Sequence, residues 1–151
     1  TVYGFEFNFM RKLNFLPGAM KGLSAYLNYT FTGSDASTQD RSNMRLPGQA
    51  MHTGNASLSW DYKGFSSKAS LNYNGSYIHS VASNENDDII QDDRFQLDLN
   101  ISQQITKKIS LYAEFVNITN SPARQYQGNN RQISRLAYFG WWNRFGITYR
   151  L

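Results

Sequence analysis

Hydrophobic and polar residues alternate with a period of two along most of the chain, and the helical spacing of three and four residues is absent. In the first segment, for example, Tyr3, Phe5 and Phe7 alternate with Gly4 and Glu6. Further segments follow the same rule at 23–31, 53–62, 68–77, 95–102, 109–115 and 144–151. The pattern predicts an all-β protein of about seven long antiparallel strands, each with one apolar and one polar face.

The predicted strands are long. Each covers about 10 to 16 residues, whereas globular strands usually have five or six and a tilted membrane strand needs roughly 9–11. Every charge within them falls on the polar face: Glu6, Asp61, Lys68, Asp98, Glu114, Arg144 and Arg150. A soluble sandwich would also keep charges out of its core, so it is strand length that favours a sheet spanning a membrane.

The predicted connections alternate between short and long. Short turns lie at Pro17-Gly18, Lys63-Gly64 and 106–108, and long segments run over roughly 33–48, 79–93 and 119–135. Transmembrane β-barrels of the outer membrane have this asymmetry, with tight turns on the periplasmic side and long loops outside. The alternation therefore predicts an antiparallel transmembrane barrel section.

The short turns also predict the register of the hairpins. A two-residue turn at Lys63-Gly64 pairs Gly54 with Tyr73 and Leu58 with Ala69, so outward residues meet outward residues. The turn at 106–108 likewise pairs Leu99 with Phe115, and Ile105 with Ile109. On the polar face, Lys68 lies diagonal to Asp61, and an ion pair is expected there.

Composition agrees with a two-faced sheet. Of the 151 residues, 40% are hydrophobic, 15% are aromatic and only 17% are charged, and the mean hydropathy is −0.55. The chain has no cysteine, which excludes disulfides and cysteine-based metal sites. The net charge of +4 is not gathered on one element, so no nucleic-acid partner is expected.

Three segments resemble a known family. They are 46–49 with the sequence LPGQ, 112–120 with YAEFVNITN, and 138–151 with YFGWWNRFGITYRL. In this order and spacing they resemble the closing strands of TonB-dependent outer-membrane receptors, particularly those of Bacteroidetes-type bacteria. The opening Gly4-Phe5-Glu6 is similar to the start of a late barrel strand in the same family.

The resemblance implies that residues 1–151 are the C-terminal portion of a 22-stranded barrel, namely its last seven strands. The odd strand number agrees, because single-chain bacterial barrels have even numbers. It also implies a plug domain and a TonB box that are not in this chain, and partners that comprise outer-membrane lipid, the rest of the barrel with its plug, and the TonB complex. Such barrels often end in Phe, whereas this chain ends in Leu151.

Candidate chemistry is sparse. The two histidines, His52 and His79, are too far apart in the predicted register to share a metal, and no Ser-His-Asp arrangement can be placed. The acidic segment 84–93 lacks the glycine and the final glutamate of an EF-hand, so a solvated loop is favoured over a divalent-cation site. We expect no enzymatic activity, no cofactor and no catalytic or metal-binding residue.

The last long loop carries the only candidate ligand contacts, Arg124, Tyr126, Arg131 and Arg135. Arginine and tyrosine there could bind an anionic or sugar-like solute, although surface charge alone also explains them. The favoured function is energised uptake of a scarce large solute (siderophore, cobalamin, glycan or peptide) across the bacterial outer membrane of a Gram-negative cell. The alternatives are a passive or structural outer-membrane barrel and a soluble glycan-binding β-sandwich.

Overall fold

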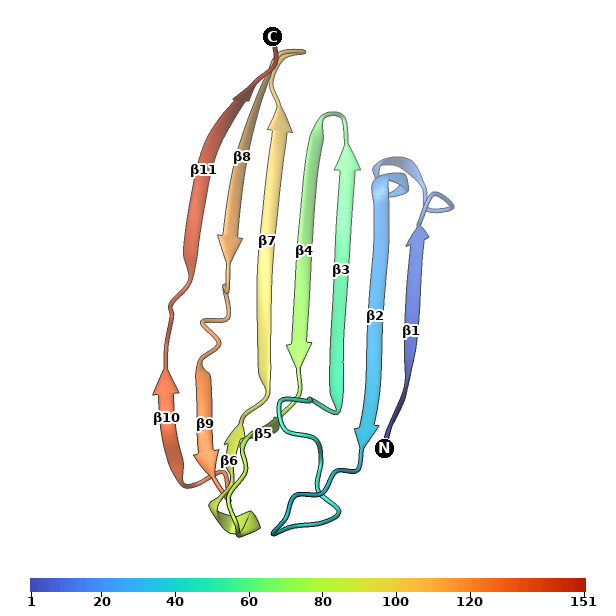
Figure 1. Cartoon of the computed structure of the whole chain (residues 1–151). Helices are drawn as coiled ribbons and strands as arrows, with labels where there is room; N and C mark the ends of the chain where they lie inside the picture. Colours follow the sequence, from blue (N-terminus) through green and yellow to red (C-terminus); the bar gives the residue numbers. More distant parts are fainter.

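The computed structural model describes residues 1–151, and its main feature is one antiparallel sheet of seven strands (Figure 1). The strand order is β1-β2-β3-β4-β7-β8-β11, so strands adjacent in the chain are adjacent in the sheet. The strands are β1 (Val2–Lys12), β2 (Leu23–Ser34), β3 (His52–Tyr62), β4 (Phe65–Asn74), β7 (Arg94–Gln104), β8 (Ile109–Val116) and β11 (Trp142–Tyr149). The predicted all-β antiparallel fold is confirmed.

A second sheet of four short strands extends one end of the first. Its order, β10-β9-β6-β5, repeats the order of the strands that it continues, β11, β8, β7 and β4. The four strands are β5 (Tyr77–Ser80), β6 (Ile89–Gln91), β9 (Ala123–Gln127) and β10 (Ile133–Ala137). The sequence analysis treated most of these residues as loop, so the long connections are more ordered than predicted.

Short and long connections lie at opposite ends of the sheet, as predicted (Figure 1). The short-turn end carries the 3-10 helix η1 (Gly18–Gly22), the Lys63-Gly64 turn and the turn between β7 and β8. The long-loop end carries segment 35–51, the β5–β6 hairpin with the 3-10 helix η2 (Glu85–Asp87), and the β9–β10 hairpin. The structure contains no helix that is long and apolar enough to span a membrane.

The predicted registers are confirmed. Gly54 pairs with Tyr73, Leu58 with Ala69, and Leu99 with Phe115. Two details differ from expectation. Strands β8 and β11 have only 8 residues each. The expected ion pair between Lys68 and Asp61 does not form.

The missing ion pair has a geometric cause. Lys68 is directly opposite Ser59, and Asp61 is directly opposite Ser66. The two charged residues are therefore diagonal neighbours, whose Cβ atoms in an antiparallel sheet are about 7–8 Å apart. Both side chains would have to bend toward one another, and the gain from an ion pair in water is small.

The apolar face is a surface and not a core. Only 6 of the 151 residues are buried, and the side chains of Phe7, Leu58 and Ile147 are 49%, 50% and 71% exposed. Aromatic rings form two belts on this face. The belt near the long-loop end comprises Tyr3, Phe5, Tyr29, Phe31, His52, Tyr73 and Phe95, and the belt near the short-turn end comprises Trp60, Tyr62 and Phe65.

The middle of the band between the belts is aliphatic, with Ala56 between Leu27 and Leu71, and Ala69 between Leu58 and Leu99. On β3, Gly54 lies at the level of the belt near the long-loop end, and Trp60 belongs to the belt near the short-turn end. Six residues separate them, which is about 20 Å along a strand. An apolar band flanked by aromatic girdles is the arrangement of strands that cross a bilayer.

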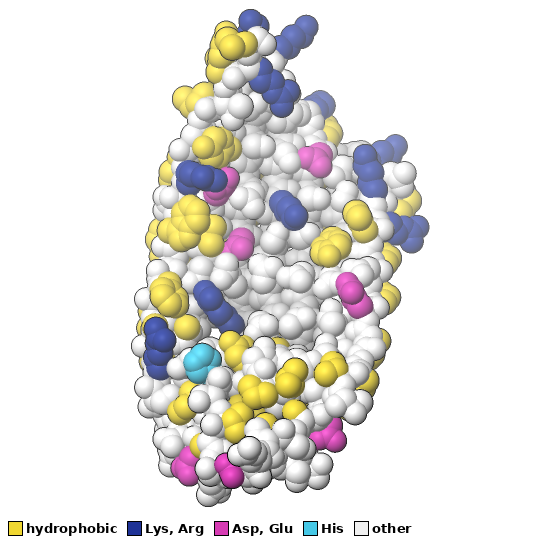
Figure 2. Space-filling view, in the orientation of Figure 1, with side chains coloured by type: hydrophobic (Ala, Val, Ile, Leu, Met, Phe, Trp, Pro, Cys, Tyr) yellow, Lys and Arg dark blue, Asp and Glu magenta, His cyan; other side chains and the backbone are white.

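The opposite face is polar, and Figure 2 shows charged side chains scattered over the middle of the sheet. One row of amides crosses five adjacent strands: Asn8, Asn28, Asn55, Asn72 and Gln96 are paired in succession. The Nδ2 of Asn28 donates to Asn8 at 2.7 Å and to the Glu6 carboxylate at 2.9 Å. Such a row offers hydrogen bonds to water or to a polar filling of the barrel.

Candidate functional site

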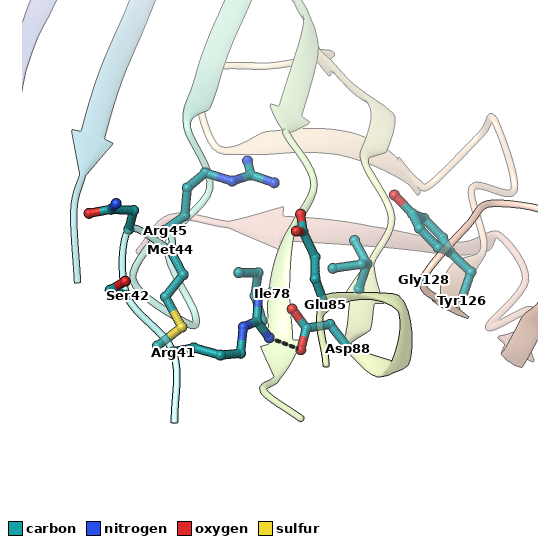
Figure 3. A pocket seen from close by; sticks show the side chains of 11 residues that line it. Arg41, Ser42, Met44, Arg45, Ile78, Glu85, Asp88, Tyr126 and Gly128 are labelled. Carbon is teal, nitrogen blue, oxygen red and sulfur yellow. Dashed lines mark hydrogen bonds and ion pairs between the residues drawn. The ribbon is translucent and has the colours of Figure 1, made fainter. Parts of the chain in front are cut away.

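A cavity of about 360 Å³ opens at the long-loop end, where three loops meet (Figure 3). Its lining is mostly polar and comprises Arg41, Ser42, Asn43, Met44, Arg45, Ile78, Glu85, Asp88, Ile90, Tyr126 and Gly128. These residues come from segment 35–51, from the β5–β6 hairpin and from β9 with the turn that follows it. We refer to it as the loop cavity.

Segment 35–51 forms one wall because it docks on the β5–β6 hairpin. Ala36 and Met44 pair with each other in an isolated bridge, which folds the segment back on itself. The N–H of Gly48 donates to the carbonyl of Ile78 at 2.8 Å. Met44 and Ile78, each 7% exposed, are the buried hydrophobic residues of the chain. The floor of the loop cavity is therefore a small apolar core that the main sheet itself lacks.

A buried ion pair fixes the same segment. An Nη1 atom of Arg41 lies 2.6 Å from Oδ1 of Asp88 and also donates to the carbonyl of Ala82 at 3.1 Å. The N–H of Ala82 donates to the same Asp88 oxygen at 2.8 Å. The Asp88 side chain is 2% exposed. The hydrogen bond that the Asp88 carboxylate accepts raises the pKa of Arg41, and the negative charge of Asp88 acts in the same direction.

We expect Asp88→Asn to release segment 35–51. The substitution preserves shape but removes the charge that Arg41 faces, and a buried cation without its partner favours opening to water. Backbone amides of residues 36–48 should exchange hydrogen on the order of tenfold faster in mass spectrometry of the full-length protein. Asp87→Asn is the matched control, because Asp87 is an exposed neighbour that forms no ion pair. Equal exchange in the two variants would show that the ion pair does not hold the segment.

Tyr126 forms the opposite wall. It pairs with Ile90 of β6, which pairs with Ile78 of β5, so the three side chains form one row across the second sheet. Burial raises the pKa of Tyr126, and the charge of Asp92 acts in the same direction. The phenol therefore stays protonated at neutral pH and can donate a hydrogen bond to a ligand.

Two charges in the lining have no ionic partner. Arg45 and Glu85 line the loop cavity, but the three ion pairs of the structure involve neither of them. The cation of Arg45 is close enough to lower the pKa of Tyr126 against the effect of burial. The cavity thus presents a free guanidinium, a free carboxylate and a phenol beside an apolar floor, which suits a ligand with both charged and apolar parts.

Comparison with known proteins assigns the chain to a family. Residues 1–118, more than three quarters of the sequence, match the family model described as TonB dependent receptor-like, beta-barrel. The chain belongs to this family. No curated protein and no solved structure matches it.

Membership of the TonB-dependent receptor family implies an orientation for the sheet. Barrels of this family are outer-membrane transporters, and in outer-membrane barrels the short turns face the periplasm and the long loops face the exterior. In that arrangement the loop cavity, at the long-loop end, would face the exterior. The apolar face with its two belts would meet lipid, and the amide row would face the barrel interior.

The predicted ligand residues are separated by the structure. Tyr126 lines the loop cavity, whereas Arg131 and Arg135 are exposed and lie outside its lining. Arg124 stacks on the Tyr126 ring at 5.9 Å from the centroid, and its guanidinium bonds to Asp92 at 2.7 Å and to the carbonyl of Asn130. Arg124 therefore positions Tyr126 and is already occupied by protein groups.

The acidic segment 84–93 is more structured than the expected solvated loop. Asp88 is buried against Arg41, and Asp92 pairs with Arg124. Desolvation raises the pKa of Asp93, and the adjacent Asp92 charge adds to the effect. No three His, Cys, Asp or Glu side chains lie close enough to hold a metal ion. The carboxylates of Asp88 and Asp92 join loops.

The sequence analysis missed the contribution of segment 35–51 to the site. Arg41 and Arg45 gave no periodic signal, and Asp88, the partner of Arg41, is more than forty residues away in the chain. The available clue was the position of Met44 between Arg41 and Arg45, since an apolar residue between two cations in a long loop indicates docking against another segment.

Asn117 joins the main sheet to the outer sheet. Its N–H donates to Oδ1 of Asp98 at 2.8 Å, its Nδ2 donates to the carbonyl of Gly140 at 2.8 Å, and its Oδ1 accepts from the N–H of Ser121 at 2.9 Å. Asn117 is 3% exposed and has a φ of 56°, which asparagine tolerates better than most residues. This residue sets the direction in which β9 leaves β8, and so places Tyr126.

Proposed function

We propose that the chain forms part of the wall and outer mouth of a TonB-dependent transporter that takes up a scarce large solute across a Gram-negative outer membrane. The observation that carries the proposal is the coincidence, in one sheet, of a lipid-type apolar face with two aromatic belts and a polar face that ends in the loop cavity. A wall of this kind passes polar material on one side and meets hydrocarbon on the other.

We further propose that residues 1–151 are the last seven strands of a 22-stranded barrel in a Bacteroidetes-type bacterium. The plug and the TonB box would belong to the rest of the polypeptide, and the TonB complex would supply the energy. The lone edges of β1 and β11 support this, because unpaired backbone groups in lipid are costly and the remaining strands would pair with them.

In this proposal the loop cavity is the first contact of the solute. Arg45, Glu85 and Tyr126 would bind its polar groups, and Met44 and Ile78 would contact its apolar part. The amide row below then offers a hydrogen-bonding path along the inner wall. No bond is made or broken in the solute, so the chemistry is binding and release. Siderophore, cobalamin, glycan and peptide all remain open as substrates.

The test of transport is energised accumulation in cells. Cells with the complete gene should accumulate one labelled solute among a ferric siderophore, cobalamin, an oligosaccharide and an oligopeptide, and deletion of the gene or of TonB should abolish this uptake. Uptake that survives loss of TonB would instead identify a passive barrel. Absence of uptake of every solute class in the presence of TonB would contradict a transport role.

The test of the loop cavity uses the solute so identified. We expect Tyr126→Ala to weaken binding to the purified full-length protein about tenfold, because ring contacts and a hydrogen bond to the solute are lost together, at about 1.4 kcal/mol per factor of ten. Isothermal titration calorimetry measures this. The paired control, Arg131→Gln, alters an exposed side chain outside the lining and should bind as the unmodified protein does. A larger loss of affinity in Arg131→Gln than in Tyr126→Ala would show that the solute binds at the tip of the β9–β10 hairpin and not in the loop cavity.

A further inference from the structure

Positive charge is concentrated at the periplasmic, short-turn end of the sheet. Basic residues occur there at every turn and at the adjoining strand ends, and we call them the basic rim: Arg11, Lys12, Lys21, Lys63, Lys107, Lys108 and Arg150. Asp61 is the one acidic residue at this end, and it forms no ion pair. Figure 2 shows the dark blue side chains gathered toward this end of the molecule, at the top of the view.

The opposite end does not share this excess. The outer loops carry arginines at 41, 45, 124, 131 and 135, but these are matched by acidic residues at 35, 40, 85, 87, 88, 92 and 93. Two of the arginines are engaged in ion pairs there. The formal charge of +4 therefore arises from the periplasmic side, and the protein is electrically polarised along the strands.

Several cations of the basic rim lie against rings at the edge of the lipid-facing surface. The Arg11 guanidinium is 5.3 Å from the centroid of the Phe15 ring, the Lys63 amine is 5.3 Å from that of Tyr62, and the Lys108 amine is 5.9 Å from that of Tyr149. Aromatic residues at this level mark the boundary between hydrocarbon and headgroups. The cations are thus held at the depth at which lipid phosphates lie.

We propose that the basic rim binds the phosphates of anionic phospholipids in the periplasmic leaflet. Its residues are spread from β1 to β11 along the whole edge of the sheet, in the line that a shell of lipids around a barrel would follow. An acidic protein partner would instead need a single compact patch. The three cation–ring pairs add that the charges sit beside the lipid-facing belt, where a headgroup can reach them.

The proposal does not depend on transport, and it can be tested on the full-length barrel. We would place the protein in nanodiscs of phosphatidylcholine with about one third phosphatidylglycerol, extract it gently, and count the retained phosphatidylglycerol molecules by native mass spectrometry. Lys63→Gln/Lys108→Gln should retain at most about half of the phosphatidylglycerol that the unmodified barrel retains, because charge attraction weakens with each cation removed. Retention by the unmodified barrel should also fall when salt is raised from about 0.1 to 0.5 M.

The matched control is Arg131→Gln/Arg135→Gln, which removes the same charge from the outer end and should leave retention unchanged. Lys63→Arg/Lys108→Arg keeps the two charges and should retain phosphatidylglycerol as the unmodified barrel does. This variant shows that substitution at these positions does not by itself prevent insertion. Inorganic phosphate at millimolar concentration should not compete, because it lacks the acyl chains that hold a headgroup at the rim. Equal loss in the rim and control variants, displacement by phosphate, or retention of an acidic periplasmic protein in place of lipid would overturn the proposal.

Discussion

Leu58→Arg is expected to destabilise the barrel in a bilayer by about 2–4 kcal/mol, which is the cost of a lipid-facing arginine near the midplane. Leu58 lies on β3 between Ala25 and Ala69, within the aliphatic band, and its side chain is 50% exposed. A charge there would lie among the apolar side chains of Leu27, Ala69 and Leu71. This is one of the two largest effects that we expect from a single substitution.

The matched control is the preceding residue on the same strand. Ser57 faces the barrel interior, between Tyr26 and Ser70, so Ser57→Arg should cost less than about 1 kcal/mol in the same assay. Reversible denaturant unfolding of the full-length barrel in lipid vesicles, followed by tryptophan fluorescence, measures both. Similar costs for the two variants would mean that the two faces do not differ in their surroundings, and the membrane orientation would be wrong.

The main sheet could be predicted from the sequence because its determinants are local. A period of two assigns each side chain to a face, and a two-residue turn then fixes the register of a whole hairpin. Lys63 and Gly64 have φ values of 47° and 80°, so both central residues of the turn have the positive φ that a tight hairpin with matching twist requires. With this turn fixed, the pairing of Gly54 with Tyr73 at the other end of the hairpin follows without further information.

The outer sheet could not be predicted because its local signals are weak. Strands β5, β6, β9 and β10 have between 3 and 5 residues, which is too short for a period of two to stand out. Register shifts between Ile78 and Ser80 and between Ile133 and Arg135 break the alternation further. Such a strand is recognised only once the neighbour on which it pairs is known.

The loop cavity could be predicted only in part, for a related reason. Tyr126 is one of the four candidate ligand contacts predicted from the sequence, and the structure places it in the lining of the loop cavity. The sequence did not show that Arg124 would form an ion pair with Asp92, or Arg41 with Asp88, because residue type reveals a charge but not its partner. A pairing between loops that are separated by a full hairpin is a property of the folded sheet.

The second large effect is expected from Asn117→Ala, at about 2–4 kcal/mol. The variant keeps the backbone bond to Asp98 but leaves the carbonyl of Gly140 and the N–H of Ser121 without partners in a partly buried place. An unpaired buried polar group costs about 1–3 kcal/mol. Because Asn117 fixes the exit of β9 from β8, hydrogen exchange should also accelerate through the β9–β10 hairpin while β1–β4 stay protected.

Asn120→Ala provides the comparison that isolates the side-chain bonds. Asn120 also has a positive φ, 48°, so both variants place alanine in a left-handed conformation at a cost of roughly 1–2 kcal/mol. The side chain of Asn120 makes no hydrogen bond that corresponds to those of Asn117. The excess loss in Asn117→Ala, measured by denaturant unfolding of the full-length barrel, is therefore the contribution of the bonds to Gly140 and Ser121. If the two variants lose the same stability, backbone strain alone accounts for the effect, and the outer sheet must be held in place by the loop contacts at Arg41 and Asp88.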